Sequence, residues 1–190
     1  MSKIHECLFL FSFLSICWFS MQAVHEFGHI AGAITTGGKV ELVVLHPLTI
    51  SRTDLAKNPH PLIVAWAGPI LGSIVPLLFF AVVNRRGILA RPMSNFFQGF
   101  CLISNGLYIG LGSLGRIGDA GDLLRLGAPP ATLWLFGITA SIGGLLFWHR
   151  LGPGMGWTAI SAQVTPKTSY LLAGSLLAIL LFMVLFGGRN

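Results

Sequence analysis

The chain has 190 residues, of which 54% are hydrophobic and only 9% are charged. Soluble domains carry about 25% charged residues, so this composition excludes an ordinary soluble protein and indicates a polytopic membrane protein. The net charge of +6 comes from scattered Lys and Arg residues, with no run longer than Arg85-Arg86. We interpret these residues as contacts to lipid headgroups. We therefore expect the lipid bilayer as a partner, no binding to nucleic acid, and a single membrane-embedded domain over residues 1–190.

The first apolar segment runs without a charge from Cys7 to Val24. A short basic start before an apolar run also describes a signal peptide. However, Met21-Gln22-Ala23 is a poor match to a small-x-small cleavage site, and the apolar pattern continues to residue 34. We therefore predict one uncleaved helix from about residue 8 to 36, ended by Gly37-Gly38.

Within this segment, His25, Glu26 and His29 form the pattern H-E-x-x-H. Residues four apart share a helix face, so the two imidazoles can bind one ion, while Glu26 can reach a water molecule on that ion. A zinc hydrolase requires such a set, because two imidazoles hold the metal and a carboxylate takes a proton from the water. The alternative is a set of polar residues that bind neighbouring helices or line a water-filled cleft. Ionisable residues inside an apolar helix cost about 2.5–3.5 kcal/mol each, which favours a functional role.

Residues 39–57 form the longest amphipathic interruption. Segments 40–45 and 49–53 have strand-like composition and are separated by His46-Pro47, which predicts a short β-hairpin. The open edge of such a hairpin could pair with an extended peptide. An ordinary connecting loop explains the composition equally well.

Two further apolar segments follow. Residues 62–83 are uncharged and long enough to span a bilayer, although Gly68-Pro69 and Pro76 interrupt them. Residues 92–115 are also uncharged and contain a G-x-x-x-G pair at 106 and 110, which is typical of close helix packing. Asn105 lies in this second run. It could connect helices, or it could be a substrate-binding residue that holds a peptide carbonyl near the metal.

Asp119 and Asp122 are the only acidic residues after position 54. Zinc bound by two His side chains usually has a third protein ligand, which leaves one position for water. The two aspartates are three residues apart and would share a helix face, so either could complete the site. The alternative is a solvated turn in which Arg116 and Arg125 form ion pairs with them.

The C-terminal part contains two apolar segments of 18 residues, 131–148 and 170–187, joined by a Gly/Pro-rich connector at 151–166. We interpret them as scaffold helices. Together, the segments predict an all-α polytopic membrane protein with about five transmembrane helices, within limits of four to six, and a short β-hairpin at 39–57.

Three of these motifs resemble the site-2 protease family of intramembrane zinc metalloproteases, especially its small bacterial-type members without a PDZ domain. They are HEFGH in the first helix, Ala67-Gly68-Pro69 in the next span, and the sequence GDAGDLLR at 118–125. The resemblance covers about residues 8–126, which would form the catalytic core, with scaffold helices within 131–187. It implies an integral protein of the bacterial cytoplasmic membrane.

The resemblance also implies roles for individual residues. His25, His29 and Asp119 would bind Zn²⁺, with Asp122 as the alternative third ligand, and Glu26 would be the general base. The implied reaction is hydrolysis of peptide bonds in membrane-protein or peptide substrates. Two other hypotheses stand beside it: an inactive family member that binds and regulates membrane proteins, and a metal or proton transporter that uses the same side chains as its path.

Overall fold

The computed structural model describes residues 3–83, 90–149 and 164–188, and most of the expected connector at 151–166 lies outside them. Helices dominate the described chain, and a single pair of strands follows the first helix. In chain order the elements are α1 (Lys3–Thr35), β1 (Lys39–Val44), β2 (Arg52–Lys57), α2 (Pro61–Val83), α3 (Ala90–Gly115), α4 (Gly118–Arg125), α5 (Pro130–His149) and α8 (Pro166–Phe186).

Four of the described helices, α1, α2, α5 and α8, are long and apolar enough to cross a membrane. Helix α3 has a comparable length of 26 residues but carries more polar side chains, and it packs between α2 and α5. Large apolar side chains such as Leu171, Leu181 and Leu185 on α8 are exposed, as expected for surfaces that face lipid. The expected all-α polytopic membrane fold is confirmed, and the protein is an integral membrane protein.

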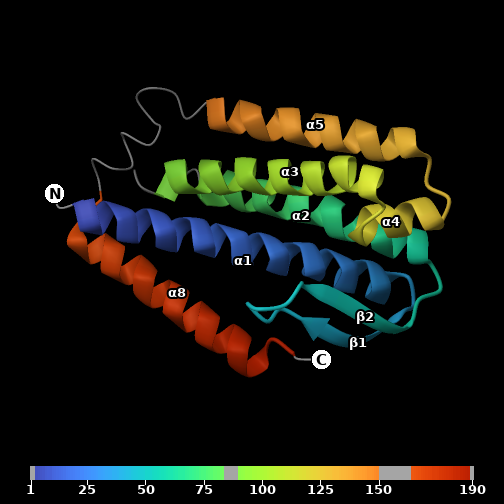
Figure 1. Cartoon of the computed structure of the whole chain (residues 1–190), viewed down its shortest axis with the longest axis horizontal. Coiled ribbons are helices and arrows are strands. Elements are labelled where there is room, and N and C mark those ends of the chain that lie inside the picture. The colour runs from blue at the N-terminus through green and yellow to red at the C-terminus, as the bar shows by residue number, and fades with distance from the viewer. Residues whose placement is uncertain (1–2, 84–89, 150–163, 189–190) are drawn as a thin grey trace.

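The long helices lie roughly side by side in the order α5, α3, α2, α1, with α8 running obliquely along the far side of α1 (Figure 1). Helices α3 and α5 are in close contact. A Cβ atom added at Gly137 would lie 2.7 Å from the Cα atom of Gly110, and one added at Gly144 would lie 2.6 Å from the carbonyl oxygen of Gly99. The two backbones therefore touch, which confirms the close packing predicted from the G-x-x-x-G pair.

Helix α1 ends where the sequence predicts. Gly37 adopts a φ of 77°, a backbone conformation that favours glycine, and the Gly38 amide donates to the Ala33 carbonyl at 2.8 Å. The chain can then reverse, so that the following strands lie beside the C-terminal half of α1 (Figure 1).

Strands β1 and β2 pair antiparallel, from Lys39 opposite Lys57 to Val44 opposite Arg52. The prediction of a hairpin at 39–57 is confirmed, and the ordinary-loop alternative is wrong. The end of α8 is tied to this hairpin, because the Leu45 amide donates to the Gly187 carbonyl at 2.6 Å. The hairpin is thus held between the first and last helices of the chain.

Candidate metal centre

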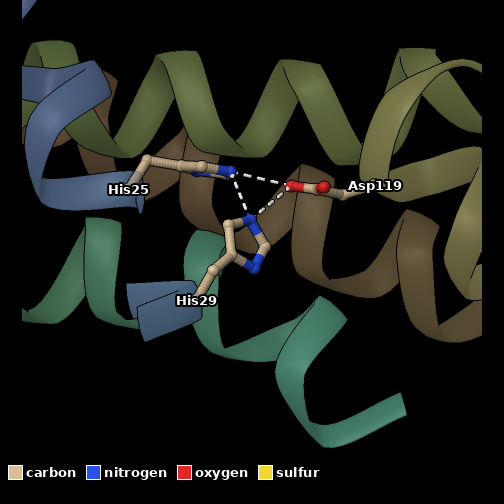
Figure 2. Close-up of side chains that lie close together, drawn as sticks. All are labelled: His25, His29 and Asp119. Carbon is tan, nitrogen blue, oxygen red and sulfur yellow. Dashed lines mark hydrogen bonds and ion pairs between the residues drawn. The ribbon is translucent and has the colours of Figure 1, made fainter. Parts of the chain in front are cut away.

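Two helices bring together three side chains that could bind a metal. His25 and His29 lie one turn apart on α1, and their Nε2 atoms are 3.1 Å apart. Asp119, in the first turn of α4, places its Oδ2 atom 2.7 Å from Nε2 of His25 and 3.2 Å from Nε2 of His29 (Figure 2). One ligand atom from each residue therefore converges on a common point.

The hydrogen-bond partners of the two Nδ1 atoms determine which nitrogen of each imidazole carries the proton. Nδ1 of His25 lies 2.7 Å from Oδ1 of Asn105, and the amide nitrogen of Asn105 donates to the Cys101 carbonyl. Nδ1 of His29 lies 2.8 Å from the Val64 carbonyl oxygen. Because a carbonyl oxygen only accepts, each Nδ1 carries the proton, and in the neutral rings each Nε2 presents a lone pair.

Three electron-pair donors that face one another need positive charge between them. Two imidazolium N–H groups pointing at each other across 3.1 Å would repel, so protonation satisfies at most one ring. A divalent cation would satisfy both rings and the carboxylate, and this donor set of nitrogen and oxygen suits zinc. The residues present therefore fit a bound metal.

The Asp119 carboxyl is suited to remain charged. Burial by itself raises the pKa of this group, but hydrogen bonds and positive charge from the His25 and His29 imidazoles, which require a proton on Nε2, outweigh burial and hold the pKa well below its usual range. A cation between the three groups would act in the same direction and keep Asp119 a carboxylate. This charge state is the one that binds a cation.

Glycines let α2 approach the two histidines. A Cβ atom at Gly68 would overlap the His29 imidazole, and one at Gly72 would lie 2.9 Å from Oδ1 of Asn105. On α1, a Cβ atom at Gly28 would lie 2.5 Å from the Ala67 carbonyl oxygen. The small residues of the Ala67-Gly68-Pro69 motif thus have a steric role, because any side chain at 68 would displace a candidate ligand.

Glu26 lies on α1 between the two histidines but outside the set of three converging ligand atoms. Its side chain is buried, and its Oε2 atom accepts a hydrogen bond of 2.8 Å from the Thr53 hydroxyl on β2. The hairpin therefore contacts the expected general base directly. Thr53 was not singled out in the sequence, because nothing in the pattern of residues 39–57 indicates which side chain faces α1.

A cleft of about 980 Å³ connects these groups. His25, Glu26, His29 and Asp119 line it together with residues of the hairpin and of α3. This volume is at the upper end of the range for pockets that enclose small molecules, about 300–1,000 Å³. The cleft could therefore hold a short extended segment of polypeptide beside the candidate ligands.

The structure separates the two aspartates that the sequence left as alternatives. Asp122 also lines the cleft, but its carboxylate forms an ion pair with Arg125 and does not join the converging atoms. Asn105 is buried and contacts His25 through its side chain. Tyr108, which the sequence reading missed, lies one turn beyond Asn105 on α3 and packs its ring against His25. Tyr108 follows Asn105 by three residues and so shares its helix face, which is the sequence feature that could have indicated it.

Comparison with known proteins supplies one match. A family model described as Peptidase M50B-like matches residues 14–109, just over half of the chain. The matched region includes HEFGH, Ala67-Gly68-Pro69 and Asn105, and it ends before Asp119. Nothing matches among curated proteins or among solved structures.

Proposed function

The chain belongs to the Peptidase M50B-like family, a branch of the site-2 protease type of peptidase, and from this premise we propose that it is an intramembrane zinc metalloprotease. Its substrates would be membrane-embedded proteins or peptides. By the resemblance to small bacterial-type members, its location would be the bacterial cytoplasmic membrane.

The convergence of His25, His29 and Asp119 carries this proposal. In each histidine, Nδ1 forms a hydrogen bond with a carbonyl oxygen, and this bond directs Nε2 toward Asp119. Such outer hydrogen bonds orient metal-binding imidazoles in zinc proteins. When bound, the zinc ion would act as a Lewis acid that polarises the scissile carbonyl and makes water nucleophilic at neutral pH.

Glu26 would move the proton. It would accept a proton from the attacking water and transfer it to the nitrogen of the leaving amine. The hydrogen bond from Thr53 would fix one carboxylate oxygen, so that the other is free to face the water. Burial of Glu26 would keep bulk solvent away during the transfer.

The substrate would have to unwind locally. In a helix, each peptide carbonyl is engaged by an amide four residues further along, so an intact helix resists attack. A cleft of about 980 Å³ would accommodate a short extended segment, which would fit cleavage of a locally unwound chain. An edge of the β-hairpin beside the cleft could pair with such a segment.

The test uses Glu26→Gln in the full chain, purified in detergent. We expect one zinc ion per chain by mass spectrometry in both wild type and variant. Wild type should cleave members of a panel of single-span transmembrane peptides, and the variant should lose at least about 100-fold in rate, the lower range for a general base. Full turnover by Glu26→Gln would show that Glu26 is not the general base.

A companion set of variants tests the ligands. His25→Ala and Asp119→Ala should lose zinc, and Asp122→Ala should retain it, because the Asp122 carboxylate pairs with Arg125 instead. Wild-type protein that binds zinc but cleaves no peptide would support the inactive, regulatory alternative. Zinc uptake into sealed vesicles, unaffected by competing peptides, would support the transport alternative.

A further inference from the structure

Tyr108 occupies a defined position beside the candidate ligands. Its ring meets the His25 imidazole edge to face, with ring centroids 5.7 Å apart, and its side chain lines the cleft. The phenol oxygen accepts a hydrogen bond of 3.2 Å from the backbone amide of Asp119. The neighbouring Gly118 has a φ of 52°, and a Cβ atom there would overlap the phenol oxygen. The chain before Asp119 is therefore built around this hydroxyl group.

The hydrogen of this hydroxyl group has no acceptor among the described residues. A phenol can accept and also donate one hydrogen bond, and here the amide of Asp119 uses the accepting side. The residue is 41% exposed and lines the cleft. Its O–H is thus free to donate to a molecule that enters.

Thr53 and Asn105 also contact the site from neighbouring elements, and each donates a hydrogen bond to another protein group. The Thr53 hydroxyl donates to Glu26, and the Asn105 amide donates to the Cys101 carbonyl. The Asn105 amide has a second hydrogen, but this residue is only 1% exposed, whereas Tyr108 is 41% exposed. Of the three side chains, Tyr108 is therefore the best placed to donate to a peptide carbonyl next to His25 and Asp119.

We propose that Tyr108 is a catalytic residue that donates a hydrogen bond to the scissile carbonyl oxygen as it becomes negatively charged; this inference rests on the proposed peptidase function. The water oxygen bonds to the carbonyl carbon, its proton passes to Glu26, and the π electrons of the carbonyl move to its oxygen. Tyr108 stabilises that oxyanion and keeps its own proton. The carbonyl then re-forms, the C–N bond breaks, and the leaving nitrogen takes the proton from Glu26.

A structural role for Tyr108 makes a different prediction. If the hydroxyl group only positions Asp119, its removal should weaken zinc binding, and activity should fall in proportion to the zinc lost. If it stabilises the oxyanion, its removal should leave zinc and the bound substrate unaffected and act on the transition state. Tyr108→Phe separates these cases because it removes one oxygen atom and retains the ring against His25.

The experiment compares wild type, Tyr108→Phe and Tyr170→Phe in the full chain. Tyr170 is the other tyrosine of the sequence and lies on α8 against His5, outside the cleft lining. We expect Tyr108→Phe to lower kcat about 100-fold, as removal of one oxyanion donor does, with little change in KM or zinc content. Tyr170→Phe should match wild type.

Binding provides a readout that does not depend on turnover. A phosphinic peptide carries a tetrahedral anionic group in place of the scissile bond and resembles the transition state. Its affinity should fall in Tyr108→Phe by about the same factor as kcat/KM. Binding of the uncleaved substrate peptide, measured in the Glu26→Gln background, should stay the same with and without Tyr108→Phe.

The outcomes distinguish this inference from the function on which it rests. If wild type and Tyr108→Phe cleave equally fast, or if the variant loses zinc in step with activity, the catalytic role is overturned while the peptidase function stands. If zinc-loaded wild type cleaves nothing and binds no phosphinic peptide, both proposals are overturned.

Discussion

The two imidazoles of the candidate metal centre are held by different kinds of partner. Nδ1 of His29 meets a backbone carbonyl, that of Val64, which substitution of side chains cannot remove. Nδ1 of His25 meets a side chain, that of Asn105. The orientation of His25 is therefore the one that a single substitution can change.

We expect Asn105→Ala to weaken zinc binding about 10- to 100-fold, as removal of such outer partners does. The measurement is competition with a fluorescent chelator of known zinc affinity. Ser104→Ala is the matched control, because Ser104 also lines the cleft but forms no hydrogen bond with His25. If Asn105 instead held the substrate, as the sequence suggested, KM would rise and zinc affinity would stay unchanged.

Some of these residues could be predicted from the sequence and others could not. His25, Glu26 and His29 lie on one helix, so helical spacing alone places them together. Asp119 and Asp122 share a helix face, and only the packing of α4 against α2 and α3 separates their surroundings. Thr53 and Tyr108 come from other elements, and their contacts depend on how β2 and α3 are rotated. Their roles, like those of the ligands, remain predictions.

The long elements were predictable because their length and apolar composition leave few alternatives. The predicted segments 62–83 and 92–115 correspond closely to α2 (Pro61–Val83) and α3 (Ala90–Gly115). The hairpin was predictable from strand-like composition, but its register was not. Its pairing shifts between Lys39 and Leu42, and strand-like composition does not specify where such bulges occur.

Helix α2 approaches α1 so closely at Gly68 that a larger residue there should disturb the metal centre. Gly68→Ala adds a Cβ atom that overlaps the His29 imidazole, so one of the two must move. We expect zinc affinity to fall at least about tenfold, because small displacements of a metal ligand are costly, and the midpoint of thermal unfolding to fall as well. Gly174→Ala on α8 is the control, since no atom lies within 4 Å of its added Cβ atom. Equal zinc affinity in both variants would contradict the steric role.

Across the whole molecule, the cleft depends on parts of the chain that are far apart in sequence. The candidate ligands come from α1 and α4, whereas the hairpin that contacts Glu26 is tied to the end of α8. At its C-terminal end, α8 is therefore bonded to the hairpin and not to the candidate ligands. A change at the end of α8 should therefore affect the hairpin more than the candidate metal centre.

Gly187→Val tests this separation. A Cβ atom at Gly187 would lie 2.3 Å from the Met183 carbonyl oxygen and 3.0 Å from the His46 amide nitrogen, so valine should disturb the end of α8 and displace the chain between the strands. We expect kcat to fall several-fold, because Thr53 would no longer hold Glu26, while zinc content stays the same. Limited proteolysis should also cut faster within residues 45–51. Gly174→Val, on the same helix with open space around it, should change neither measurement.

The contact between α3 and α5 has a consequence for how this sequence can evolve. Where Gly106 and Gly137 meet, even a methyl group has no room, and at Gly110 it would be tight, so most random replacements there should be eliminated. The outer side of α8 has the opposite character, because one apolar residue there can replace another at little cost. Sequences that diverge from this chain should therefore change fastest on the lipid-facing side of α8. They should change slowest along the α3–α5 contact, which takes no part in the proposed chemistry.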